Sequence, residues 1–192
     1  MPIPTVLDNP AVLVARIDDD SAAAQAGQPI RHAHALLIGV RDGEGWLLHR
    51  GRDGNRSLPI ARGRVDWLGA GELLTPAAPR RPLGEALLVE VRSLPDAPGV
   101  ARTFGDKMLF QNDTVSVYEE ILGPTQVRRM HSHAPRLIIP LTGAHAVQRF
   151  PGGEAREDRF PAGGAHWAAH VVTHEIENVG DAPFWAICVE HV

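Results

Sequence analysis

Residues 123–143 read GPTQVRRMHSHAPRLIIPLTG, and this stretch decides how the rest of the chain is interpreted. It begins and ends on glycine, and its apolar residues 137–141 follow a proline, as is typical of short strands between turns. Because side chains alternate across a strand, we expect His131 and His133 to share one face and to bind one metal ion. A third ligand has to come from elsewhere. We favour His174, which lies in an expected strand that is followed by Asn178 and a turn.

Short apolar runs of the same kind recur along the whole chain. Of its 192 residues, 19 are glycine and 16 are proline, so turns are frequent. The alanine-rich residues 21–26 are the one plausible helix start, and Gly27 and Pro29 break it. We therefore predict an all-β protein of antiparallel sandwiches or barrels with little helix. The expected strands are residues 11–15, 35–40, 86–91, 114–118, 137–141, 171–177 and 185–190.

The chain also repeats itself at an offset of 100 residues. The matches include Trp67 with Trp167, Leu37-Ile38 with Leu137-Ile138, Gly43 with Gly143, Gly63 with Gly163 and Val89-Glu90 with Val189-Glu190. Upstream, Asn9-x-x-Val12 matches Asn112-x-x-Val115 at an offset of 103, as a small insertion would produce. We infer two copies of one β-unit, residues 1–95 and residues 96–192, joined within residues 93–111.

The histidines separate the two copies. Seven of the ten lie after residue 130. At an offset of 100, Arg31 stands for His131 and Leu74 stands for His174, so the metal ligands are gone from the first copy. A pair, His32-x-His34, survives one residue out of register, which on a strand would put it on the wrong face. We expect the first copy to be a degenerate barrel without metal ligands.

The second copy resembles the cupin superfamily. The first motif of that family is matched by Gly123, His131, His133 and Gly143, and the second by Pro161-x-Gly163 followed by His174-x-x-x-Asn178. The resemblance covers about residues 112–192 and reaches the first half through the repeat. The whole chain is therefore similar to a bicupin, and the resemblance implies two jelly-roll barrels in tandem.

Two features depart from the family pattern. The glutamate that should follow the histidine pair is missing, since residues 134–137 are Ala-Pro-Arg-Leu. The third histidine should follow the Pro-x-Gly segment by two residues, which is the place of His166, whereas His174 has the matching asparagine context. His166, His170 and His174 are also spaced as on one helix face, but the β-branched residues 171–173 favour a strand. We therefore keep His174 as the third ligand.

The resemblance also implies a chemistry. Cupins with three histidines and no glutamate include thiol and diketone dioxygenases that use iron(II), so iron is the expected metal, with zinc, manganese or nickel as alternatives. Three neutral imidazoles leave a divalent ion its full charge and open positions, which suits a small anionic substrate. Arg129 or Arg136 could bind its carboxylate, and Trp167 could form an apolar wall. A fourth ligand could come from His166, His170 or Gln148.

Composition excludes several other classes of function. The formal net charge is −4 and the charges are scattered, so the chain offers no basic stripe for nucleic acid. The apolar runs are far shorter than the roughly 20 residues that span a bilayer, and the N-terminal residues have no leader pattern. The single cysteine, Cys188, makes no internal disulfide. We expect a cytoplasmic protein that binds a small molecule, and by analogy with cupins a homodimer.

Three functions remain open at this point. The first is a metal-dependent oxygenase that acts on a small organic acid. The second is a non-enzymatic cupin that binds a ligand or metal for sensing or storage, and the third is a metal-free structural bicupin. A shared fold does not choose among them.

Overall fold

The computed structural model describes residues 4–18, 30–31, 34–49, 54–76, 84–98, 100 and 105–192. The chain divides into two compact units, Met1–Ser93 and Leu94–Val192. The described residues form 18 β-strands and contain no helix, and hence none long and apolar enough to cross a membrane. The alanine-rich residues 21–26 lie outside the described part of the chain.

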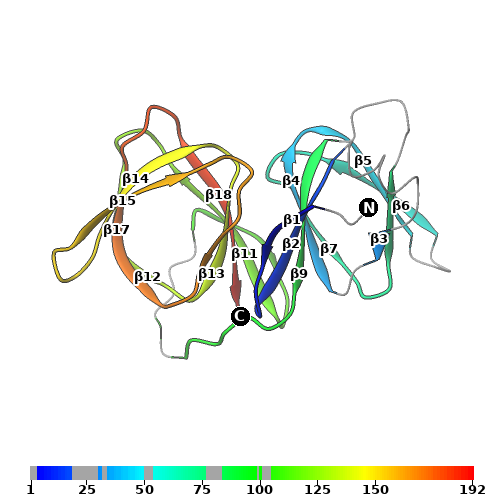
Figure 1. Cartoon of the computed structure of the whole chain (residues 1–192), viewed down its shortest axis with the longest axis horizontal. Helices are drawn as coiled ribbons and strands as arrows, with labels where there is room; N and C mark the ends of the chain where they lie inside the picture. The colour runs from blue at the N-terminus through cyan, green and yellow to red at the C-terminus, as the bar shows by residue number, and fades with distance from the viewer. Residues whose placement is uncertain are drawn as a thin grey trace. The chain divides into compact units, whose positions relative to one another are not determined.

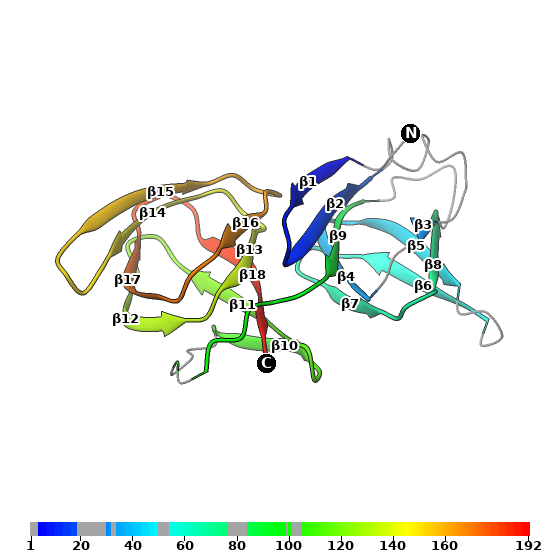
Figure 2. The same cartoon turned by 60° about the horizontal axis from the view of Figure 1, so that its bottom comes forward.

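The C-terminal unit consists of two antiparallel sheets (Figure 1 and Figure 2). One has the strand order β10-β11-β18-β13-β16, and the other has the order β12-β17-β14-β15. Most neighbours in a sheet are not consecutive in the chain, as in a jelly roll. The strands are β10 (Lys107–Gln111), β11 (Val115–Leu122), β12 (Val127–His133), β13 (Arg136–Pro140), β14 (Ala144–Arg149), β15 (Ala155–Phe160), β16 (His166–Ala168), β17 (Val172–Asn178) and β18 (Phe184–His191).

The interior of this unit has an apolar end and a polar end. At the apolar end, Leu122, Phe184 and Ala186 of one sheet pack against Ala146 and Ile176 of the other. Further along the same strands, the inward positions become polar. The buried side chains there are Tyr118, Glu120, His133, Arg136, Gln148, His174, Cys188 and Glu190. The candidate site lies among them.

The N-terminal unit repeats the two-sheet arrangement, with the strand orders β1-β2-β9-β4-β7 and β3-β8-β5-β6. Its core is apolar, and Asp66 is the one buried charged side chain among the described residues of this unit. The strands are β1 (Thr5–Asp8), β2 (Val12–Ile17), β3 (Ile30–Arg31), β4 (Ala35–Arg41), β5 (Gly43–His49), β6 (Asn55–Ile60), β7 (Val65–Leu68), β8 (Leu73–Pro76) and β9 (Glu85–Val91). The core residues are Ile17, Ala35, Leu37, Trp46, Leu48, Leu58, Ile60, Leu68, Leu74, Ala86 and Leu88.

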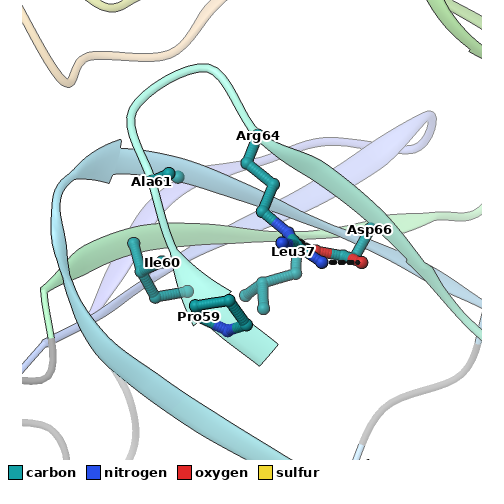
Figure 3. Close-up of a pocket in the computed structure, with 7 residues that line it drawn as sticks. Leu37, Pro59, Ile60, Ala61, Arg64 and Asp66 are labelled. Carbon is teal, nitrogen blue, oxygen red and sulfur yellow. Dashed lines mark hydrogen bonds and ion pairs between the residues drawn. The ribbon is translucent and has the colours of Figure 1, made fainter. Parts of the chain in front are cut away.

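A small pocket in the N-terminal unit carries charge at one side (Figure 3). Arg64 and Asp66 line it together with apolar residues such as Leu37. Arg64 Nε donates to Asp66 Oδ2 at 2.6 Å, and Arg56 also donates to this carboxylate, at 2.5 Å. The charged side chains that line the pocket are therefore already paired with one another.

Matching hydrogen bonds identify the two units as copies of one design. Asn9 Oδ1 accepts from the backbone N–H groups of residues 11 and 12, and Asn112 Oδ1 accepts from those of residues 114 and 115, at 2.8 and 2.9 Å in both. Gly63 and Gly163 both have a positive φ, of 79° and 71°, at the turn before the strand that carries the repeated tryptophan. Each of the seven expected strands is present. The predicted all-β class with two jelly-roll units is confirmed.

The repeat does not keep one offset. Trp67 pairs with Leu36, whereas Trp167 pairs with Leu137, so Leu36 and not Leu37 is the counterpart of Leu137. The reason is an irregularity in β4 between Gly39 and residue 41, which β13 lacks in its pairing with β18. Such a bulge adds one residue to a strand without changing its partner.

A second shift changes the counterpart of Leu74. Leu74 pairs with Leu48 on β5, whereas Gln148, at the same place on β14, pairs with Ile176. Leu74 therefore takes the place of Ile176 and not that of His174. The inference of an apolar substitute at His174 from a fixed offset was wrong in register, because length changes between strands move every later pairing.

Candidate metal centre

Two neighbouring strands carry the three candidate ligands. His131 on β12 is the register partner of His174 on β17, and His133 follows two residues after His131. Because side chains alternate across a strand and register partners share a face, all three point into the unit. His133 and His174 are buried, and His131 is half-buried. The structure thus brings together the three histidines that the sequence singled out.

The three imidazole rings gather around one point. One potential ligand atom of each ring lies within 4.8 Å of the others. The ring centroids are 4.6 Å apart for His131 and His133, and 4.7 Å apart for His131 and His174. The Nε2 atoms of all three rings are buried and have no hydrogen-bond partner. Because a buried polar atom without a partner costs about 1–3 kcal/mol, three such atoms together fit a site that a metal ion completes.

Hydrogen bonds at the other ring nitrogen fix the tautomers of His131 and His174. His131 Nδ1 donates to the backbone carbonyl of Arg129 at 2.7 Å. His174 Nδ1 donates to the side-chain oxygen of Gln148. Because Nδ1 carries the hydrogen in both rings, Nε2 keeps its lone pair and faces the other histidines.

His133 is supported from the opposite sheet. Its Nδ1 lies 3.3 Å from the hydroxyl of Tyr118 and 3.4 Å from Oε1 of Glu190. The hydroxyl donates its own hydrogen to Glu190 at 2.5 Å, so it can only accept from the ring. This third ring is therefore also protonated at Nδ1. We did not predict this support from the sequence, although the repeated Val-Glu ending marks Glu190 as a strand residue.

Burial keeps the rings neutral. Burial, with a smaller contribution from the nearby Arg136 and His131, lowers the pKa of His174 to about 3. Burial also lowers the pKa of His131. Metal ions bind the neutral form of imidazole, so these rings are ready to bind at neutral pH without releasing a proton.

Among the described residues, no carboxylate belongs to the group of potential ligands. Two buried carboxylates, Glu120 and Glu190, come from the opposite sheet. Glu190 approaches His133 at Nδ1, away from Nε2, and Glu120 accepts from Arg128 at 3.1 Å. The donor set is therefore three nitrogens, which leaves a bound ion with open coordination positions, as in catalytic sites.

Arg136 on β13 lies buried at the polar end of the unit. It is 5% exposed, and its Nη1 lies 3.9 Å from Oε1 of Glu190. Its Nε and Nη1 have no hydrogen-bond partner. The structure thus places a buried cation beside Glu190, the carboxylate that also lies next to His133.

Arg129 lies elsewhere. It precedes His131 by two residues, but the register of β12 shifts between Arg128 and His131. The shift breaks the alternation of faces, so the Arg129 side chain is exposed. What Arg129 contributes to the histidine group is its backbone carbonyl, which accepts from His131.

Trp167 lies on the outward face of its sheet. It pairs with Leu137, whereas the next pair along, His166 and Ile138, is the one that faces the core. Its side chain is half-buried. Trp167 therefore does not face the histidine group.

The candidate fourth ligands also stay outside the group. The His166 ring packs edge-on against Phe160, with 5.2 Å between centroids, and its Nε2 is buried. His170 is exposed. The oxygen of Gln148 accepts from His174, so Gln148 supports a histidine from behind.

The described part of the N-terminal unit contains no comparable cluster of potential ligands. His34 is exposed and stacks on Trp67 with 5.8 Å between centroids. Its neighbour His32 lies outside the described residues. Leu48 stands at the place of Gln148, so the histidine support is missing as well.

Comparisons with solved structures identify the fold. No family model and no curated protein matches the sequence. Among solved structures, AerE from Microcystis aeruginosa is 11% identical over 100% of this chain and 98% of its own, with a TM-score of 0.59. A cupin 2 conserved barrel domain protein from Leptotrichia buccalis is 10% identical over 98% of this chain and 87% of its own, with a TM-score of 0.56.

A variant of oxalate decarboxylase from Bacillus subtilis is similar to the same extent. It is 10% identical over 98% of this chain and 74% of its own, with a TM-score of 0.56. At such identities the likeness establishes the fold and leaves the activity open. The chain therefore has the cupin fold, in the form of two tandem jelly-roll units that is called a bicupin.

Proposed function

We propose that this protein is a metal-dependent enzyme of the oxygenase type that acts on a small organic acid. The observation that carries the proposal is the set of three buried Nε2 atoms without partners on His131, His133 and His174. Iron is the first choice of metal, and zinc, manganese or nickel would suit the same nitrogen donors.

The chemistry of the site follows from its donors. A divalent ion bound here would supply Lewis acidity and, if redox-active, electrons for dioxygen. The three histidines would hold the ion through neutral nitrogens. They would add no negative charge to the ion, which favours an anionic substrate.

Arg136 supports a carboxylate as part of that substrate. Its guanidinium is charged at every accessible pH, is buried, and has two nitrogens without hydrogen-bond partners. A carboxylate is the acceptor that matches such donors best. We propose that Arg136 binds the acid group while a second group of the substrate reaches the metal.

The comparisons are consistent with this substrate class. The Bacillus subtilis protein of the same fold is named for oxalate, which is a small dicarboxylate. The fold likeness supports the class of ligand only by analogy.

Metal content tests the first step. The protein is purified without chelator and without a histidine tag, beside a His131→Ala/His174→Ala double variant, and both are measured by plasma mass spectrometry. We expect about one iron ion per chain in the wild type and none in the variant. No metal in either protein would overturn the proposal in favour of a structural bicupin.

Oxygen consumption tests the second step. The iron-loaded protein is offered a panel of small mono- and dicarboxylates, and dioxygen uptake is recorded with an electrode. We expect uptake with at least one acid, and a KM about 10- to 100-fold higher in Arg136→Gln. Saturable binding of an acid without turnover would reject the enzyme and leave a ligand-binding cupin.

A further inference from the structure

A chain of hydrogen bonds runs from His174 to the protein surface. His174 Nδ1 bonds to the oxygen of Gln148, whose Nε2 donates to Asp158 Oδ2 at 2.5 Å. Arg156 Nε donates to the same oxygen at 2.9 Å. Exposure rises along the chain, because Gln148 is 6% exposed while the side chains of Asp158 and Arg156 are 23% and 59% exposed.

The hydrogen bonds of this chain have one consistent direction. A carboxylate only accepts, so Asp158 requires the NH₂ group of Gln148, and the amide oxygen must then face His174. An oxygen accepts, so His174 must carry its hydrogen on Nδ1 and keep the lone pair on Nε2. With the amide reversed, its NH₂ group would donate to Nδ1, and the hydrogen would move to Nε2. Asp158 thus selects, through Gln148, the tautomer that can bind an ion at Nε2.

The same hairpin also contacts the face of the ring. Phe150, which follows β14, stacks on His174 with 6.4 Å between centroids and 26° between planes. Arg156 on β15 lies over Phe150 at 5.7 Å from the ring centre. The β14–β15 hairpin therefore restrains His174 both by a directed hydrogen bond and by stacking.

The N-terminal unit has neither the three histidines nor the residues that form this series of hydrogen bonds. By strand register, Leu48 stands for Gln148 and Leu58 stands for Asp158. Both leucines are fully buried in the apolar core. The amide and the carboxylate thus occur in the one half that has a histidine to orient.

We propose that Gln148 and Asp158 are positioning residues that hold His174 in its metal-binding tautomer. The consequence for metal affinity rests on the proposed function. The tautomer itself is a property of the metal-free protein and can be measured without any ion.

The test uses the full-length protein with the substitution Asp158→Asn. The introduced amide can accept or donate, so the side chain of Gln148 is free to reverse. Long-range ¹H–¹⁵N spectra of the metal-free protein report which ring nitrogen of His174 carries the hydrogen. We expect one Nδ1–H form in the wild type and a mixture in the variant. The Kd for cobalt(II) should rise roughly 10-fold in Asp158→Asn and roughly 10- to 100-fold in Gln148→Leu.

A rescue variant separates positioning from packing. In Gln148→Glu/Asp158→Asn, the introduced carboxylate accepts from His174 and from the introduced amide, so the tautomer is again fixed. We expect a single Nδ1–H form and a cobalt(II) Kd within about threefold of the wild type. Glu157→Gln is the matched control, since Glu157 lies on the same strand and contacts His145 instead. Thermal unfolding verifies that every variant folds.

Two outcomes would overturn the proposal. One is a single Nδ1–H form of His174 in Asp158→Asn. The other is a Gln148→Glu/Asp158→Asn double variant that binds cobalt(II) no better than Asp158→Asn does. Failure of the wild type to bind cobalt(II) counts against the proposed function instead, and the spectra of the metal-free protein still decide the positioning role.

Discussion

The two halves of the molecule share a fold and differ in what fills it. The N-terminal unit is packed with buried aliphatic residues and Trp46, whereas the C-terminal unit is polar at one end of its interior. Both interiors sit between sheets of the same strand order and handle turns with the same asparagine contacts. Alternation of inward and outward residues is therefore enough to form the fold, whereas a polar site in its interior also requires hydrogen-bond partners for the buried polar groups.

The residues that support the polar site are also absent from the N-terminal unit. By strand register, Ala15 stands for Tyr118 and Ile17 stands for Glu120. The supporting residues thus differ between the halves together with the histidines. A buried polar side chain without a partner is costly, so the polar set is stable only as a whole.

Substituting one histidine in each half should give the largest difference between the halves, measured as the change in cobalt(II) affinity. His133→Ala takes away one of three nitrogen donors, and we expect the cobalt(II) affinity to fall at least about 100-fold. His34→Ala, which removes an exposed ring stacked on Trp67, should leave the affinity unchanged. Titration followed by the visible absorption of cobalt(II) measures both. Equal losses would show that the ion binds outside the three-histidine group.

Exchanging an inward residue should show how differently the two interiors are built. Leu48→Gln places an amide in the apolar core without the partners that Gln148 has, and we expect it to lower the free energy of unfolding by about 2–5 kcal/mol. Leu48→Met, which keeps an apolar side chain of similar volume, should cost less than about 1.5 kcal/mol. Urea unfolding followed by tryptophan fluorescence gives both values. If the two variants were equally stable, the contrast between the interiors would lose its energetic basis.

Acid should weaken the C-terminal half of the metal-free protein in particular. The folded-state pKa of His174 is about 3, and the ordinary value in the unfolded chain is about 6.5, so the unfolded state binds the proton first as the pH falls. Stability is therefore full above about pH 6.5 and declines toward pH 3. Between about pH 7.5 and 5.0, His174 accounts for a loss of about 2 kcal/mol.

The comparison that tests this is the pH dependence of urea unfolding in wild type and His174→Asn. The variant should lose about 2 kcal/mol less over the same range, provided both are free of metal. Burial also lowers the pKa of His131, so a smaller slope should persist in the variant. Identical slopes would contradict the lowered pKa of His174.

The smallest effect should be the same in both halves. Asn9→Ala and Asn112→Ala each remove two bonds from a side-chain oxygen to backbone N–H groups, and each should cost about 1 kcal/mol. Thermal unfolding of the two variants measures the loss. A clear difference between them would mean that the two turns are not equivalent, despite their matching distances.

The sequence carries much of the fold because turns and alternation are local signals. The seven expected strands are those with β-branched or aliphatic runs, and the bounds differ from the observed ones by a few residues. Strand β15, by contrast, reads AREDRF and is mostly exposed, so nothing in its composition marks it as a strand. It forms because β14 offers a hydrogen-bonding edge, which is a tertiary effect.

The residues of the site also fall into those that local sequence signals predict and those that depend on tertiary structure. His131, His133 and His174 were predicted because a strand puts alternate residues on one face and the family pattern supplies the third ligand. The position of Arg129 was not predictable, because a bulge in β12 turns its side chain outward. The position of Trp167 depends on which face of its strand points inward, and the sequence does not show this. The role of Gln148 depends on its contacts with residues of two neighbouring strands.

The chain of bonds behind His174 bears on protein engineering. A designer who wished to graft the centre onto the N-terminal barrel would find three histidines insufficient, because Leu48 and Leu58 stand where an amide and a carboxylate would have to be. Grafted rings would be free to choose either tautomer, and part of the population would present a hydrogen to the incoming ion. The transplantable unit is therefore the ligands with the β14–β15 hairpin behind them, and a library built on that unit is smaller and better defined than one built on ligands alone.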